Sequence, residues 1–190
     1  MIVLVGFLGA GKTTVGRLLA ERLGRPFRDA DHVLVERAGR SVADIFAVDG
    51  EPAFRALEHR VVVDLLEGPD VVLALGGGAV EHPGTAAALA ALPRRRPGAH
   101  VVHLEVSLAE ARARVGDDRG RPMLARPDLD AVHARRVPGF AAVATLEVAT
   151  AGRRPREVVD AVVDGLGARG TRGADAVSEP RDAEKGQRTR

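Results

Sequence analysis

The 190-residue chain is long enough for one sizeable hydrophobic core, and with 45% hydrophobic and 28% charged residues it has the composition of a globular protein. The net charge is only +2, and residues 169–190, with six basic and four acidic residues, account for all of it. Because the rest of the chain is neutral and contains few aromatic residues for base stacking, we expect no nucleic-acid partner. The absence of cysteine excludes disulfides, thiolate metal ligands and thiol nucleophiles.

The apolar opening, MIVLVGFLGA, has the hydrophobicity of a signal peptide. It lacks a preceding basic segment and a following cleavage pattern, and it leads directly into a glycine-rich charged turn. No later apolar run approaches the roughly 20 residues that a membrane helix needs. We therefore expect a cytoplasmic protein that contacts no membrane.

Short Val-rich runs alternate along the chain with longer amphipathic segments. Five runs predict buried strands: 2–5, 26–30 (the weakest), 71–75, 101–105 and 146–149. Three segments with apolar residues at helical spacing or a helix-start proline predict helices: 13–24, 51–68 and 155–166. This alternation predicts an α/β protein with a mainly parallel sheet. The apolar pattern stops near Ala168, so we expect one domain at 1–168 and a disordered tail at 169–190.

The first predicted strand leads into GFLGAGKT, residues 6–13, which fits the phosphate-loop pattern GxxxxGK[ST] between a strand and a helix. Its glycines let backbone amides turn toward phosphate oxygens at the positive end of the helix. Lys12 can reach the β- and γ-phosphates, and the Thr13 hydroxyl can ligate magnesium. The alternative is a glycine-rich turn that binds nothing. A dinucleotide fingerprint starting at Gly9 fails, because Thr14 stands where glycine is required.

The magnesium carboxylate must come from outside the usual motifs. A GTPase would need an Asn-Lys-x-Asp motif, but the chain has no Asn, and the strand at 71–75 ends in glycines rather than in an acid. Asp64 follows a Val-rich run but lies in a helical pattern, which predicts a surface position. Asp29 and Asp31 stand at the end of the second strand. If the strand continues through both, they point to the same side, one toward the metal and one toward an acceptor hydroxyl. The alternative is a solvated turn.

Three other features suggest an acceptor site. The glycines at 76–78 follow a buried strand, which indicates backbone packed against a small substrate, or else a loose turn. Arg55 and Glu58 are three residues apart and share a helical face, as a binding pair or an exposed ion pair. Arg136 lies shortly before Pro138. Separately, Arg121 lies in a glycine-bounded, Arg-rich segment, which is either a solvated loop or a mobile lid that brings Arg121 to the transferring phosphoryl group. Taken singly, each arginine is more often a surface residue than a ligand.

The chain contains six motifs in the order and spacing of the shikimate kinases: the phosphate loop, the DxD, GE..FR..E, GGG, an RP segment and RxPxF. Because of these motifs it resembles that family over about residues 2–167. GRSVADIF, residues 39–46, also resembles the family's helix after the DxD strand. The resemblance implies a P-loop NTPase three-layer sandwich: a five-stranded parallel sheet flanked by helices, with a lid and a substrate-binding subdomain. It also implies transfer of the γ-phosphoryl of ATP, with Mg2+, to the 3-hydroxyl of shikimate in chorismate and aromatic amino acid biosynthesis. We expect a monomer.

On the acceptor side, the resemblance implies that Asp29 holds magnesium through water together with Thr13, and that Asp31 orients the shikimate hydroxyls and accepts a proton. Two arginines would clamp the substrate carboxylate, with Glu58 fixing their orientation. The implied substrate-binding residues are Asp31, Arg55, Gly77, Gly78 and Arg136. The family's RxPLY reads RVPGF here, so that Gly139 and Phe140 replace Leu and Tyr.

On the nucleotide side, the resemblance implies that Arg121 closes over the phosphates, and that Arg114 and Arg153 flank the adenine. The implied catalytic residues are Lys12, Asp31 and Arg121. The implied ATP-binding residues are Gly9, Ala10, Gly11, Lys12, Thr13, Thr14, Arg114, Arg121 and Arg153.

Two alternatives stay open. One is a related P-loop kinase acting on gluconate, a nucleoside monophosphate or a shikimate analogue. The other is a nucleotide-binding regulatory module, which would bind ATP without acceptor-dependent turnover and would not need Asp31.

Overall fold

The computed structural model describes residues 1–115 and 128–175. Five strands form one sheet: β1 (Ile2–Val5), β2 (Phe27–Asp29), β3 (Val72–Ala74), β4 (His100–Glu105) and β5 (Leu146–Ala149). Their order is β2-β3-β1-β4-β5, and every neighbouring pair is parallel. The predicted parallel sheet and all five of its strands, including the weak second one, are confirmed.

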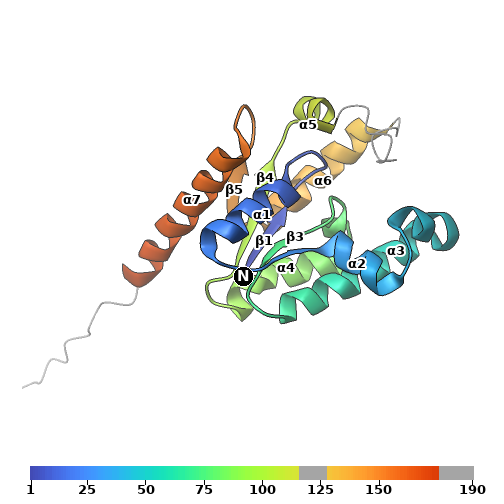
Figure 1. Cartoon of the computed structure of the whole chain (residues 1–190), viewed down its shortest axis with the longest axis horizontal. Helices are drawn as coiled ribbons and strands as arrows, with labels where there is room; N and C mark the ends of the chain where they lie inside the picture. The colour runs from blue at the N-terminus through green and yellow to red at the C-terminus, as the bar shows by residue number, and fades with distance from the viewer. Residues whose placement is uncertain (116–127, 176–190) are drawn as a thin grey trace, which may run out of the picture.

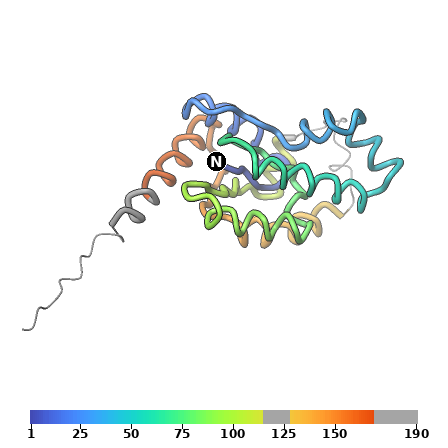
Figure 2. The backbone as a smooth tube through the Cα atoms, turned by 90° about the horizontal axis from the view of Figure 1, so that it is seen from below, coloured from blue at the N-terminus to red at the C-terminus, as the bar shows by residue number. Residues whose placement is uncertain are grey.

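Helices cover both faces of the sheet. They are α1 (Lys12–Leu23), α2 (Ala30–Ala38), α3 (Val42–Glu67), the short 3-10 helix η1 (Ala79–Glu81), α4 (Pro83–Arg95), α5 (Leu108–Val115), α6 (Leu129–Val143) and α7 (Pro155–Asp175). Helices α1 and α7 contact each other on one face, whereas α4 and α6 pack together on the other (Figure 1, Figure 2). Helix α2 and the first part of α3 contact each other and project beyond the sheet, whereas the second part of α3 returns to pack against α4 (Figure 1). This is the predicted three-layer arrangement.

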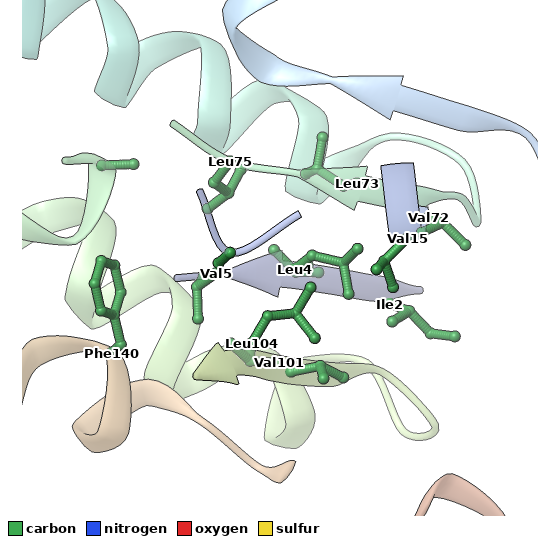
Figure 3. Packing of buried hydrophobic residues seen from close by; sticks show 14 of the residues in the cluster. Ile2, Leu4, Val5, Val15, Val72, Leu73, Leu75, Val101, Leu104 and Phe140 are labelled. Atoms are coloured by element: carbon green, nitrogen blue, oxygen red, sulfur yellow. The ribbon is translucent and has the colours of Figure 1, made fainter. Parts of the chain in front are cut away.

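The main core surrounds the central strand β1, whose four residues are all buried. Figure 3 shows side chains of β1, β3 and β4 gathered around Leu4, together with Val15 of α1. Such a strand is hydrophobic at consecutive positions because helices cover both of its faces. Phe140 of α6 is fully buried against this core, with its ring centroid 5.3 Å from that of His103. The residue that replaces the family's tyrosine therefore packs in the hydrophobic interior.

A second, smaller hydrophobic core lies between α2 and α3. It consists of Val33, Leu34, Ile45, Phe54 and Val61. Helix α3 bends at Gly50, where φ is 80° and Pro52 follows. The bend separates the two segments that the sequence predicts as helices. The first segment begins at Ser41, whose side chain accepts a hydrogen bond from the Asp44 amide in a capping box. The α2–α3 unit thus has its own packing and its own bend.

Two predictions differ from the structure. Strand β2 ends at Asp29, and Asp31 lies in the first turn of α2 rather than on a continued strand. The cause is local, since Asp29 Oδ1 accepts a hydrogen bond from the Asp31 amide at 3.1 Å and so caps the new helix. At the other end of the chain, α7 continues to Asp175 instead of stopping near residue 168. A helix that is already formed can extend without an apolar face. The remainder of the predicted tail, 176–190, lies outside the described residues.

Within residues 1–115 and 128–175, no helix combines the length and the apolarity that a membrane span requires.

Candidate active site

The phosphate loop joins β1 to α1 at the carboxyl edge of the sheet. Gly6 has a φ of 148°, and a Cβ added there would lie 2.5 Å from the Leu104 carbonyl oxygen, so no larger residue fits. Gly11, with a φ of 84°, precedes the first helical residue, and no side chain caps the helix. The α1 amides are therefore available to an anion at the positive end of the helix dipole. Lys12 Nζ donates to the carbonyls of Gly6 and Phe7 at 2.7 and 3.0 Å and curls back over the loop.

A hydroxyl and a carboxylate lie side by side next to this loop. Thr13 Oγ1 donates a hydrogen bond to Asp29 Oδ2 at 2.9 Å. The other Asp29 oxygen caps α2 and thereby places Asp31 in the first helical turn. Mg2+ prefers oxygen ligands and is commonly held by one or two carboxylates plus substrate phosphates. The two oxygen donors of Thr13 and Asp29 fit such an ion. No group of three or more His, Asp or Glu suited to a metal occurs among the residues that the structure describes.

The three glycines after β3 each face a different part of the site. A Cβ added to Gly76 would lie 2.5 Å from Glu58 Oε1 and 2.7 Å from Asp31 Oδ1. At Gly77, the nearest atom would be the Leu8 amide nitrogen of the phosphate loop, at 3.5 Å. At Gly78, the added carbon would overlap the Arg55 guanidinium. The turn is therefore in close contact with the loop, the carboxylates and the arginine at once. The prediction singled out the second and third glycines but not the first.

Arg55 and Glu58 form a largely buried ion pair on α3. Arg55 Nη1 donates to Glu58 Oε2 at 2.7 Å, and the Glu58 side chain is only 3% exposed. Burial raises the pKa of Glu58 above its ordinary 4.5, Arg55 offsets part of that rise, and Asp31 adds to it. Burial disfavours the charge on Arg55, yet its carboxylate neighbours more than compensate and raise its pKa. The pair is therefore part of the site interior, which excludes the alternative of an exposed surface pair.

Glu81, at the end of η1, belongs to the same cluster and was not predicted. Its Oε2 accepts a hydrogen bond from Arg136 Nε at 2.8 Å, and its Oε1 accepts from Arg135 Nη2 at 2.8 Å. The same Oε2 lies 3.8 Å from Arg55 Nη2. Burial works against ionisation of Glu81, but the hydrogen bonds from Arg136 and Arg135 outweigh it and lower its pKa. The only sequence signal was an acid shortly after the glycine turn, and no motif marks it.

A hollow of about 500 Å³ opens beside this cluster. Its charged lining residues are Glu51, Arg55, Glu81 and Arg135. Arg136 lies behind them and is only 4% exposed. Asp31, Arg55, Glu58 and Arg136, all predicted as acceptor-site residues, therefore lie around one glycine turn.

Two of the predicted nucleotide-side arginines, Arg114 and Arg153, lie near Thr150, and Arg114 also reaches the phosphate loop. Arg114 of α5 donates to the Gly9 carbonyl at 3.3 Å and to Thr150 Oγ1 at 2.8 Å. The Arg153 amide donates to the Thr150 carbonyl at 3.3 Å, and its side chain is exposed. Ala10 is buried in the loop and Thr14 is exposed on α1. The predicted lid residue Arg121 lies outside the described residues.

A phosphate loop that faces a compact acceptor site of carboxylates and arginines, on a five-stranded parallel sheet, defines the class of P-loop small-molecule kinases. Residues 8–166 match the family model described as shikimate kinase. The chain belongs to the shikimate kinase family.

Individual relatives agree with this assignment. The shikimate kinase of Thermobifida fusca is 46% identical over 173 residues, which cover 90% of this chain and 96% of the relative. That of Saccharopolyspora erythraea is 49% identical over 166 residues, covering 85% and 91%. Among solved structures, shikimate kinase from Acinetobacter baumannii in complex with shikimate is 32% identical, covers 88% of this chain and 93% of its own, and superposes with a TM-score of 0.81.

Proposed function

We propose that this protein transfers the γ-phosphoryl group of ATP to the 3-hydroxyl of shikimate, producing shikimate 3-phosphate and ADP for chorismate and aromatic amino acid biosynthesis. The observation that carries the proposal is the glycine turn, against which Asp31, Glu58 and Arg55 all pack beside the phosphate loop. Such a site suits an acceptor that has both a hydroxyl and a carboxylate. The shikimate kinase of Acinetobacter baumannii, whose structure is that of a complex with shikimate, supports the same acceptor.

The acceptor carboxylate is bound by Arg55 and Arg136. Guanidinium groups suit this role because their planar N–H donors match the two oxygens of a carboxylate. Glu58 holds Arg55 in position through the 2.7 Å hydrogen bond. Backbone groups of Gly77 and Gly78 border the ring. A substrate fixed at its carboxylate presents its hydroxyl in one orientation, which favours transfer.

Asp31 orients the reacting hydroxyl and accepts its proton. The new bond forms between the acceptor oxygen and the γ-phosphorus, while the bond from that phosphorus to the bridging oxygen breaks and ADP leaves with the electron pair. Lys12 and the α1 amides neutralise charge on the phosphate oxygens. Arg121 adds a further positive charge in this proposal, on the strength of the sequence pattern alone.

Mg2+ would be held by Thr13 directly and by Asp29 through water. When bound, the ion neutralises and orients the phosphate oxygens of ATP. Arg114 and Arg153 are proposed to flank the adenine, because both lie near Thr150 next to Gly9. We further propose a monomer that acts in the cytoplasm.

An ADP-release assay with and without shikimate tests this function. We expect ADP release to depend on both shikimate and Mg2+, and shikimate 3-phosphate to be found as the product. Turnover with gluconate or a nucleoside monophosphate, but not with shikimate, would refute the assignment. ATP binding without turnover on any acceptor would instead support a regulatory module.

A further inference from the structure

We propose that Glu81 is a resident counter-ion of the carboxylate-binding arginines, and that substrate binding moves it from Arg136 onto Arg135 at the rim. The inference rests on the proposed function, because it assumes that Arg55 and Arg136 receive the substrate carboxylate. It makes Glu81 a positioning residue that controls substrate affinity.

The first observation is that Glu81 neutralises a buried cation. Arg136 is only 4% exposed, and a buried guanidinium needs a partner because desolvation of an unpaired charge is costly. Glu81 Oε2 accepts from Arg136 Nε at 2.8 Å and lies 2.6 Å from its Nη2. In the absence of substrate, this carboxylate thus provides the negative charge that the clamp requires.

The second observation is that Glu81 already contacts an alternative partner. Its other oxygen, Oε1, accepts from Arg135 Nε at 3.0 Å and from Arg135 Nη2 at 2.8 Å. The Arg135 side chain is 61% exposed and lines the hollow, whereas Arg136 lies in the interior. A small rotation of the Glu81 carboxylate would therefore release the buried Arg136 while Glu81 stays paired with the exposed Arg135.

The third observation concerns the balance of charge. The clamp arginines Arg55 and Arg136 are paired with Glu51, Glu58 and Glu81, and Arg135 adds a third positive charge through its own pair with Glu81. A substrate carboxylate placed between the two arginines would approach Glu81 Oε2, which itself lies 3.8 Å from Arg55 Nη2. Like charges so close together repel. The repulsion between Glu81 and the substrate carboxylate consequently weakens substrate binding unless Glu81 moves away.

The test measures KM for shikimate and kcat at saturating ATP in four proteins: wild type, Glu81→Gln, Arg135→Ala and the double variant. Removal of the competing charge in Glu81→Gln should lower KM roughly twofold to fivefold, the effect of one partly exposed charge pair, with a smaller change in kcat. Arg135→Ala should raise KM, because Glu81 then has no rim partner. In the Glu81→Gln background, the effect of Arg135→Ala should disappear.

Binding measurements without turnover provide the second readout. Calorimetry should show tighter shikimate binding to Glu81→Gln. The same variant should bind an analogue whose carboxylate is replaced by a hydroxymethyl group no differently from wild type. A matched control is Glu67→Gln, which removes a surface pair with Arg95 at the far end of α3 and should leave KM unchanged.

Opposite results identify what has failed. An unchanged or raised KM in Glu81→Gln would overturn the inference, and a raised value would show that Glu81 merely holds the arginines in place. Because Arg135 is exposed, Arg135→Ala should remain folded. It therefore provides an independent test if Glu81→Gln does not fold. A wild-type protein that fails to phosphorylate shikimate would refute the proposed function instead.

Discussion

The Thr13 hydroxyl donates a hydrogen bond to Asp29 Oδ2 at 2.9 Å, which connects the first turn of α1 to the end of β2. The two residues are sixteen positions apart in sequence and belong to different motifs. Their contact places two oxygen donors side by side at the edge of the phosphate loop. These are the two residues that would hold the proposed Mg2+.

Removal of either oxygen donor should weaken the use of Mg2+. For Thr13→Ala and Asp29→Asn, we expect the Mg2+ concentration at half-maximal rate to rise about tenfold or more, since each loses an oxygen that orients the ion or its water. The measurement is the rate of ADP release across a Mg2+ titration at fixed ATP and shikimate. An unchanged midpoint in both variants would exclude these residues from the metal site.

Asp31→Asn should reduce turnover while leaving nucleotide binding intact. The amide cannot accept the hydroxyl proton, so kcat should fall by roughly 10²- to 10⁴-fold, the range for loss of a general base. The affinity for ATP, measured by calorimetry, should stay close to that of wild type because Asp31 faces Gly76 on the acceptor side. A kcat within a few-fold of wild type would show that Asp31 serves only to bind the acceptor.

Arg55→Ala should act mainly on the acceptor. Loss of a charged donor to the carboxylate should raise KM for shikimate by roughly 10²-fold, whereas KM for ATP changes little. The matched control is Arg37→Ala, which removes an exposed pair with Asp64 and should leave both constants unchanged. Equal KM values for Arg55→Ala and wild type would argue for an acceptor without a carboxylate.

Gly78→Ala should disturb the same arginine from the opposite side. The new Cβ would overlap the Arg55 guanidinium, so Arg55 must shift, and we expect KM for shikimate to rise about tenfold or more. Gly167→Ala is the control, because nothing lies within 4 Å of its added Cβ. In that exposed helical position, alanine should leave activity unchanged and stabilise the fold by up to about 1 kcal/mol. An unchanged KM for shikimate in Gly78→Ala would mean that the Arg55 guanidinium can move without weakening substrate binding.

Glu81 should contribute to stability in a pH-dependent manner. Its pKa in the folded protein is lowered below the ordinary 4.5 because hydrogen bonds from Arg136 and Arg135 outweigh the opposing effect of burial. Its stabilising contribution is therefore fully present above pH 4.5 and is lost as the pH falls through the lowered pKa. Urea unfolding should show Glu81→Gln less stable than wild type near neutral pH, by about 1 kcal/mol. The difference should close in acid, and a difference that grew in acid would contradict the sign of the shift.

The sheet and the phosphate loop could be predicted because local sequence determines them. Buried parallel strands are continuous apolar runs, and the spacing of Gly6, Gly11 and Lys12 between a strand and a helix is a recognisable local motif. The placement of Asp31 in a helix could not be read in the same way, because a three-residue strand leaves no period to show where it ends. Asp29 decides the point by capping the next helix.

Glu81 shows a different limit of the sequence. Its partners Arg135, Arg136 and Arg55 lie 54, 55 and 26 positions away in sequence. They also belong to other helices, so no local pattern connects them with Glu81. The ion pair of Arg55 and Glu58 was predictable as a shared helical face. Its burial was not, because that depends on how α3 packs against the glycine turn. Long-range packing thus supplies the part of the site that spacing does not.

The two separate hydrophobic cores have a consequence for how such an enzyme can diversify. The large core supports the sheet and the phosphate loop, while the small one, between α2 and α3, supports the unit that carries Arg55 and Glu58. Leu65 packs against both cores, but the five buried residues of the small core do not belong to the large one, so substitutions there act first on the acceptor side. Acceptor specificity can therefore change during evolution while the ATP-binding site is retained.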